Sequence, residues 1–238
     1  PTSTPFQRQS GSHLLIVGQQ EDAALAMLAV SAVALSAHAA AAAPRVFILD
    51  ASPYEQGQVA PLESLAHQLP NASFGGLRSA PATIAQVHTL LEQRSADDAA
   101  HHDPVYLFIY ALHRFRDLRK SDDFSYSSSE EQTKTPAQQF AAILRDGPPL
   151  GIHVLSWTDT VANVERTLER NSIREFDNRI LFQMSGTDST QLIDSPVAST
   201  LGRHRALLYR EQLGVPEKFR PYAMPDPAWF EQAAAAIK

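Results

Sequence analysis

The sequence LLIVGQQEDAALAMLAV, residues 14–30, contains the pattern from which the fold is predicted. Four apolar residues, Leu14–Val17, precede Gly18, two glutamines and a long run rich in alanine and leucine. A continuous apolar run is typical of a strand buried on both faces of a parallel sheet, and alanine has the highest helix propensity. The stretch therefore predicts a strand, a glycine turn and a buried helix.

The alanine-rich run from position 25 to position 43 has no charged residue and roughly the length that a bilayer requires. Much of it is alanine, and it includes Ser31, Ser36 and His38, so its transfer into lipid would be unfavourable. Glu21 and Asp22 precede it, where a signal peptide would carry positive charge. We interpret it as a helix buried on most of its faces, and we expect no direct membrane contact.

Five further apolar runs follow, separated by segments with helical spacing of apolar residues. The runs are Val46–Leu49, Val105–Tyr110, Val154–Trp157, Ile180–Met184 and Ala206–Tyr209. The helical segments are 81–94, the residues after Pro136, and 161–168. Strands that alternate with helices predict an α/β domain with a mostly parallel sheet flanked by helices.

Two other segments lack this pattern. Residues 120–135 are polar and serine-rich, and we expect a mobile surface loop there. Residues 216–229 contain four prolines and predict an extended surface segment before a short alanine helix. We expect Phe219, Tyr222, Trp229 and Phe230 to anchor that segment.

The composition excludes several classes of site. The 238 residues suit one large domain, and 20 Lys and Arg against 26 Asp and Glu give a net charge of −6. Such a chain would bind nucleic acid only if its cations gathered on one face. There is no cysteine, so disulfides, thiolate metal sites and a cysteine nucleophile are excluded.

The turn after the first strand can be aligned with the phosphate-binding motif G-x-x-x-x-G-K-[ST]. Gly18 fills the first position and residues 19–22 the variable ones. Ala23, Ala24 and Leu25 then replace the second glycine, the lysine and the hydroxyl residue. Without these groups, nothing reaches the β- and γ-phosphates and Mg²⁺ lacks its protein ligand.

Two acidic residues occupy the same turn. Glu21 and Asp22 would place carboxylates where phosphates bind, and acidic residues in a first helical turn complement the helix dipole. A plain strand–turn–helix, with an empty phosphate loop, is the favoured interpretation over a working site. Tyr110 and Ala111 occupy the end of another strand, where acids that hold Mg²⁺ would be needed. We therefore expect no hydrolysis by this segment and no cofactor. ATP and Mg²⁺ would bind only if the turn is a working nucleotide site after all.

Other motifs carry little. G-x-S-x-G and H-E-x-x-H are absent, and residues 101–103 (HHD) are interpreted as a solvated loop rather than a metal site. We expect no catalytic residue and no metal ligand in this chain. The basic segment HRFRDLRK, residues 113–120, is the best candidate for nucleic-acid binding in the sequence. We favour a solvated helix or an inter-subunit salt-bridge face over that interpretation. Residues 157–159 (WTD) would either line a cleft or form a packed aromatic followed by a helix cap.

Residues 151–209 resemble the last third of the motor domain of FtsK/SpoIIIE-type ATPases. That region has a strand ending in a polar sensor, an R-I-x-F-Q-x-S strand, an L-I-D segment and a leucine–glycine pair. The matching residues are Arg179, Ile180, Phe182, Gln183, Ser185, Asp188, Ser189, Leu192, Ile193, Asp194, Leu201 and Gly202. Residues 47–70 (FILDASP…APLESLAHQLP) also look like the second strand region of type VII secretion motors.

The resemblance implies a RecA-like P-loop NTPase fold that assembles into rings or tandem chains. It implies a linker at residues 1–12, a degenerate FtsK-like ATPase domain at 13–215 and a proline-rich tail at 216–238. The family's sensor position falls near Thr158, although Asp159 departs from the family pattern.

Three arginines would be available for contacts in trans with a neighbour's nucleotide. They are Arg174, Arg179 and Arg203. The favoured interpretation is that they form salt bridges to Glu175, Asp177 or a ring partner.

The function predicted from these residues is a non-hydrolysing pseudo-ATPase module, the C-terminal part of a larger cytoplasmic motor that other segments could tether to the membrane. It would bind a partner or protein substrate, or regulate neighbouring ATPase domains or subunits of the same motor. One alternative is an ATP-driven DNA or protein translocase domain that binds nucleotide weakly or completes a neighbour's site. The other is a stand-alone adaptor.

Overall fold

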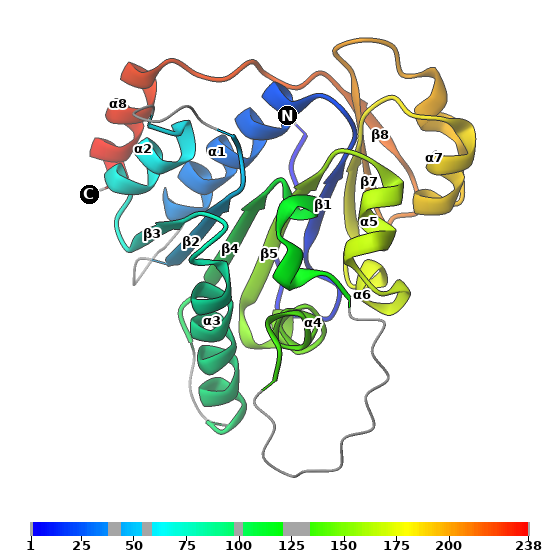
Figure 1. Cartoon of the computed structure of the whole chain (residues 1–238). Helices are drawn as coiled ribbons and strands as arrows, with labels where there is room; N and C mark the ends of the chain where they lie inside the picture. Colours follow the sequence, from blue (N-terminus) through cyan, green and yellow to red (C-terminus); the bar gives the residue numbers. More distant parts are fainter. Residues whose placement is uncertain (1, 38–43, 54–58, 98–101, 121–133, 238) are drawn as a thin grey trace, which may run out of the picture.

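An eight-stranded sheet forms the centre of the structure, a computed structural model that describes residues 2–37, 44–53, 59–97, 102–120 and 134–237 (Figure 1). The strand order is β3-β2-β4-β5-β1-β6-β7-β8. Strands β1 to β6 are parallel, and β7 and β8 are added antiparallel at one edge. The predicted α/β class with a mostly parallel sheet is confirmed.

The predicted apolar runs all fall in or overlap strands. The strands are β1 (Leu14–Val17), β2 (Arg45–Asp50), β3 (Ala72–Gly75), β4 (Val105–Tyr110), β5 (Ile152–Thr158), β6 (Asn178–Leu181), β7 (Ala206–Arg210) and β8 (Glu217–Phe219). The runs Leu14–Val17 and Val105–Tyr110 match β1 and β4 at both ends. β6 is shifted: it begins two residues before the run Ile180–Met184 begins and ends three residues before that run ends. The edge strands β3 and β8 were not predicted.

Helices cover both faces of this sheet. They are α1 (Glu21–Ala37), α2 (Pro61–Gln68), α3 (Ala80–Ser95), α4 (Pro136–Asp146), α5 (Val161–Thr167), α6 (Arg170–Arg174), α7 (Gly186–Ile193) and α8 (Pro227–Ile237). Leu14 lines a hollow beside α1, whereas the ring of the adjacent His13 is hydrogen-bonded to Leu144 O of α4. Since successive strand residues point to opposite faces, α1 and α4 lie on opposite sides of the sheet.

Helix α1 confirms the predicted buried helix as far as Ala37; residues 38–43 of that prediction lie outside the described residues. Its side chains at Ala24, Leu28, Ala29 and Ala32 are fully buried against the sheet. Alanine at three of these four positions lets the helix backbone approach the sheet closely. No helix in the described part of the chain combines the length and hydropathy needed to cross a membrane.

The segment after β4 differs from its prediction. Instead of one helix, this basic segment forms two short 3-10 turns, Leu112–Arg114 and Arg116–Leu118. Ala111 has a φ of 60°, in the left-handed region, and Phe115 is extended, so no continuous helix can form. Residues 121–133 of the predicted polar loop lie outside the described residues.

The C-terminal segment joins the sheet and then crosses to the side of α1. β8 pairs with β7, residues 220–226 have no regular structure, and α8 packs on α1 and α2. Phe219 and Phe230 pack against the core, but Tyr222 is 83% exposed and Trp229 40% exposed. The prediction that Tyr222 and Trp229 anchor this segment was therefore wrong. The domain boundaries at residues 12/13 and 215/216 stay a prediction.

Candidate functional site

A very short connection joins β1 to α1. Only residues 18–20 separate Val17, the last residue of the strand, from Glu21, the first of the helix. Gly18 has a φ of 130°, and a Cβ at this position would lie 2.7 Å from the Cβ of Phe182. Glycine is therefore required here by backbone conformation and by the close approach of Phe182.

Hydrogen bonds from β5 hold this turn in place. The Gly18 amide donates to Thr158 O at 3.0 Å, and the Trp157 indole Nε1 donates to Gly18 O at 2.9 Å. Both backbone polar groups of Gly18 are thus already bonded within the protein.

The positions aligned with the rest of the phosphate motif lie inside α1. The Ala24 amide donates to Gln20 O at 3.0 Å, which is a helical i to i−4 bond. The side chain of Ala24, aligned with the motif's lysine, is fully buried. A side chain at this position points into the core rather than toward the turn.

Two stacked aromatic rings fill the adjacent strand ends. The rings of Tyr110, the last residue of β4, and Trp157 of β5 have centroids 4.6 Å apart and planes 26° apart. They are 5% and 2% exposed, and the Tyr110 hydroxyl lies 3.4 Å from Glu21 O. The end of β4 is thus occupied by a buried ring that reaches the first turn of α1.

His113 and Asp159 extend this cluster toward solvent. The His113 Nδ1 lies 3.5 Å from the Asp159 Oδ1, and the imidazole meets the Trp157 ring edge-on at 5.7 Å. Burial lowers the pKa of His113, and the Asp159 carboxylate opposes that shift. The same carboxylate accepts a hydrogen bond from Asn163 Nδ2 at 2.7 Å, next to the Thr160 side chain that caps α5. Asp159 is therefore part of the start of α5.

The sensor-like residue, Thr158, is the last residue of β5. Thr158 is fully buried, and its hydroxyl has no hydrogen-bond partner among the described residues. Of the two interpretations of residues 157–159, the packed aromatic holds for Trp157, which is 2% exposed, but the cap of α5 is Thr160, outside this segment. The cleft interpretation holds for Asp159, which lines a small cavity.

A small cavity opens where β1, β5 and β6 end. It has a volume of about 240 Å³ and is lined by Gly18, Gln19, Asp159, Gln183 and Asp188, among others. In the described ranges, no group of three or more acidic or imidazole side chains could hold a metal ion. The structure thus brings two of the predicted site residues, Gly18 and Asp159, together at one cavity.

The predicted acidic pair lies elsewhere. Glu21 and Asp22 line a separate, wider hollow of about 1240 Å³, together with His204 and Arg220. Both carboxylic residues are exposed at the first turn of α1.

The three predicted arginines differ in their surroundings. Arg179 is 8% exposed, and its Nη1 donates to Leu192 O at 2.8 Å and to the Glu211 carboxylate at 2.9 Å. Its partner is Glu211, which sequence reasoning missed because only the pairing of β6 with β7 brings the two together. Arg174 on α6 and Arg203 before β7 are exposed.

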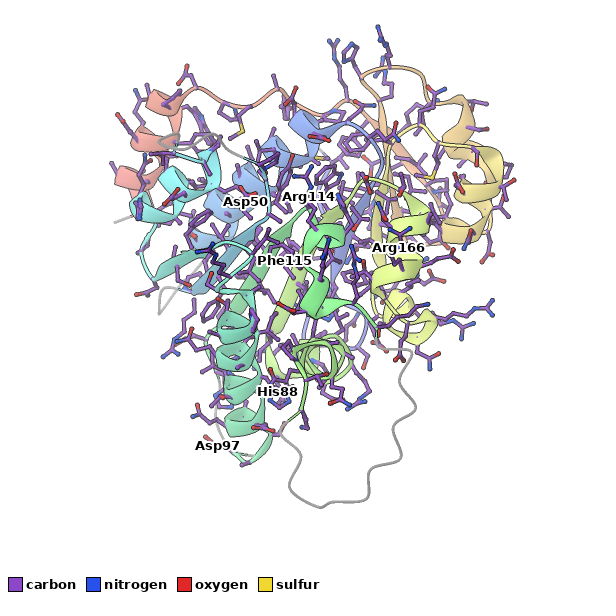
Figure 2. All side chains as sticks on the ribbon, viewed as in Figure 1. Asp50, His88, Asp97, Arg114, Phe115 and Arg166 are labelled. Carbon is purple, nitrogen blue, oxygen red and sulfur yellow. The ribbon has the colours of Figure 1, made fainter. Side chains whose placement is uncertain are left out.

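Two of the basic residues after β4, Arg114 and Arg119, donate hydrogen bonds to backbone carbonyl groups. The Arg114 Nη1 donates to Ala51 O at 3.2 Å, and the Arg119 Nη2 donates to His113 O at 2.9 Å. Figure 2 shows Arg114 at the same edge of the sheet as Asp50. Phe115, between the cations, is buried in the core. These cations stabilise the loops of this edge, and the aromatic between them is not available to stack on a base.

The fold is shared with solved ATPase structures. No family model matches the chain, and no curated protein matches its sequence. The first structural neighbour, Thermomonospora curvata EccC (ATPases 2 and 3) in complex with a signal sequence peptide, has a TM-score of 0.65 and 16% identity. That alignment covers 97% of this chain and 42% of EccC.

Two further neighbours have similar scores. The pCW3 conjugation coupling protein TcpA with ATPγS gives a TM-score of 0.64 at 10% identity, covering 94% of this chain and 64% of TcpA. EssC (ATPases 2 and 3) from Geobacillus thermodenitrificans gives 0.60 at 14% identity, covering 94% and 43%. The chain spans less than two thirds of the length of each. At these identities the likeness confirms the RecA-like fold expected from the FtsK/SpoIIIE resemblance.

Proposed function

We propose that this chain is a non-hydrolysing, ATPase-like module of a larger FtsK/SpoIIIE-like motor. The observation that carries the proposal is the stack of Tyr110 on Trp157 at the end of β4. Phosphoryl transfer needs acids at this place to hold Mg²⁺ and orient water, and a buried phenol supplies neither.

The β1–α1 turn supports the same conclusion. A phosphate-binding loop needs several consecutive free amides and a lysine. Here the turn has three residues, the Gly18 amide is bonded to Thr158 O, and Ala24 is buried in place of the lysine. The Glu21 and Asp22 carboxylates, in the first turn of α1, add negative charge next to this turn.

The adjoining cavity is also too small for a whole nucleotide. Its volume of about 240 Å³ lies below the roughly 300–1,000 Å³ typical of ligand pockets. Asp159 and Asp188 in its lining would repel the triphosphate. We therefore infer that the module holds no nucleotide cofactor and no metal.

A role through protein contacts follows if the chemistry is absent. The neighbours with this fold include a type VII secretion ATPase, EccC, and a conjugation coupling protein, TcpA, and EccC is solved with a signal sequence peptide. The module would bind a protein partner or substrate, or regulate adjacent ATPase domains, through packing and coupling across interfaces in the cytoplasm.

One observation favours a second candidate, a domain that completes a neighbour's nucleotide site in a DNA or protein translocase. Arg174 and Arg203 are exposed and have no ion pair within the part of the chain that the structure describes. Replacing each with alanine would lower the ATPase rate of the assembled motor if this candidate holds. The stand-alone adaptor is favoured by no observation.

Phosphate release from Mg-ATP tests the proposal. We expect the purified chain to release phosphate no faster than buffer alone. A rate above background is assigned to this chain only if Gly18→Val abolishes it while Gly202→Val, at a positive-φ glycine with open space around it, does not. That result would overturn the proposal.

A further inference from the structure

A groove runs along the exposed side of α1. Its first part is the hollow of about 1240 Å³ lined by residues 19–23 and Leu25 at the start of the helix. Its second part, of about 520 Å³, continues along the same helix from Ala26 to Leu35. Residues 220–222 line both parts, and Figure 1 shows this C-terminal segment passing along the side of α1 on its way to α8.

The second part of the groove is mostly apolar, although Thr2, Ser3, Thr4 and Arg220 also line it. Met27, Val30 and Ala34 line it from α1, and Leu14 and Phe219 line it from the sheet. Ala34 is exposed, and Met27 and Val30 are only half-buried. Small side chains such as Ala26, Ser31 and Ala34 leave room here that larger residues would fill. This incompletely covered helix face is our candidate for an interaction site, because contiguous exposed apolar surface is a feature of such sites.

The first part of the groove is acidic on its helix side. Glu21 and Asp22 are exposed, and neither forms a salt bridge within the described ranges. Arg220 and His204 line the same hollow without an ion pair to these carboxylates. The two carboxylates are therefore available to a cation from outside the chain.

We propose that this groove binds an extended segment of a protein partner that has a Lys or Arg followed by apolar residues. The basic side chain lies against Glu21 and Asp22, and the apolar side chains enter the hollow beside Met27, Val30 and Ala34. This inference rests on the protein-binding part of the proposed function and names the chemistry of the partner.

The dimensions favour an extended segment over a helix. Thirteen helical steps from residue 21 to residue 34 span about 20 Å, which is the length of about six extended residues. The apolar hollow of about 520 Å³ has room for a few side chains rather than a helix of roughly 10 Å diameter.

The test is a titration of the ¹⁵N-labelled chain with the synthetic peptide acetyl-KLLALS-amide, followed by NMR. We expect amide shifts in residues 21–35, 219, 220 and 222. The matched peptide acetyl-ELLALS-amide should bind roughly fivefold more weakly, because it replaces an ion pair with like-charge repulsion.

Variants locate the site. Ala34→Gln fills the apolar hollow without burying charge, so it should weaken both peptides. Ala37→Gln, at another exposed alanine of α1 that lines neither hollow, should weaken neither. The double variant Glu21→Gln/Asp22→Asn should remove the preference for the lysine peptide.

Three results would overturn the inference: no shift at a few millimolar lysine peptide, shifts confined to other surfaces, or equal binding by Ala34→Gln and the wild type. A dimer that Ala34→Gln dissociates would make a second copy the occupant and would also overturn it. Phosphate release is measured on the same sample. Hydrolysis with intact peptide binding would refute only the proposed function, and peptide failure without hydrolysis only the groove.

Discussion

The ring of Tyr110 lies 4.6 Å from the indole of Trp157, with 26° between the two planes, and that indole donates a hydrogen bond to Gly18 O. The ends of β4, β5 and β1 are thus connected through one aromatic side chain. In a working phosphoryl-transfer site these ends hold an acid, a polar sensor and the phosphate loop. The ring stack and the hydrogen bond to Gly18 therefore fill the ends of β4, β5 and β1 with packed protein groups.

Replacing Tyr110 tests whether the stack is structural. Tyr110→Asp would place a carboxylate at a site with 5% exposure, so we expect a loss of at least about 3 kcal/mol of unfolding free energy and no gain of hydrolysis. Tyr110→Phe keeps the ring and should cost less than about 1 kcal/mol. Urea unfolding measures both changes, and a Tyr110→Asp protein as stable as the wild type would refute this account.

The turn at Gly18 gives a second prediction. Gly18→Ala combines a φ of 130° with a Cβ 2.7 Å from Phe182, so we expect it to destabilise the fold by about 2 kcal/mol or more. Gly202→Ala is the matched control, because Gly202 also has a positive φ, 78°, but nothing within 4 Å of an added Cβ. Strain alone should cost about 1 kcal/mol there. Equal losses in the two variants would show that Phe182 does not confine the turn.

The acidic first turn of α1 should stabilise the fold through the helix dipole. We expect Glu21→Ala/Asp22→Ala to lower the unfolding free energy by about 1 kcal/mol in low salt. The difference should shrink in 1 M NaCl because salt screens exposed charges. Unchanged or increased stability in low salt would contradict the idea that these carboxylates complement the helix dipole.

Two buried histidines predict a pH dependence of stability. Burial lowers the pKa of His13 to about 3 and that of His153 to about 4. The His13 Nδ1 accepts a hydrogen bond from the Val154 amide, and its Nε2 is 2.9 Å from Leu144 O, so only the neutral ring satisfies both partners.

The sign follows from these pKa values. The unfolded chain binds protons below about pH 6.5, while the native chain does so only near pH 4 and 3. The unfolding free energy that these neutral histidines maintain is therefore fully present above about pH 6.5. It decreases as the pH falls from there toward pH 4 and 3. We expect about 2 kcal/mol per histidine between pH 7 and pH 5. The His153→Gln variant should lose about half of this slope, and equal stability of the wild type at the two pH values would be inconsistent with neutral burial.

Much of the fold follows from local sequence patterns. The continuous apolar runs at 14–17 and 105–110 coincide with β1 and β4, because a strand covered on both faces has no polar alternation. β3 and β8 gave no such signal. β3 is a four-residue edge strand with one buried residue, and β8 has three residues, two of them charged.

The candidate site was less predictable. The losses at Ala24 and Tyr110 are visible in the sequence, but the stack of Tyr110 on Trp157 depends on the pairing of β4 with β5. In the same way, the ion pair of Arg179 with Glu211 depends on the register of β6 and β7. Local spacing does not encode which strands become neighbours, so these contacts could not be derived from it.

Binding of nucleotide to the purified chain tests the central claim most directly. Isothermal titration calorimetry with ATP and with ADP, each in the presence of Mg²⁺, should show no binding up to millimolar nucleotide, with the fold confirmed by circular dichroism before and after. Binding at micromolar affinity would contradict the account, because it would require the stacked rings and the three-residue turn to accommodate a triphosphate.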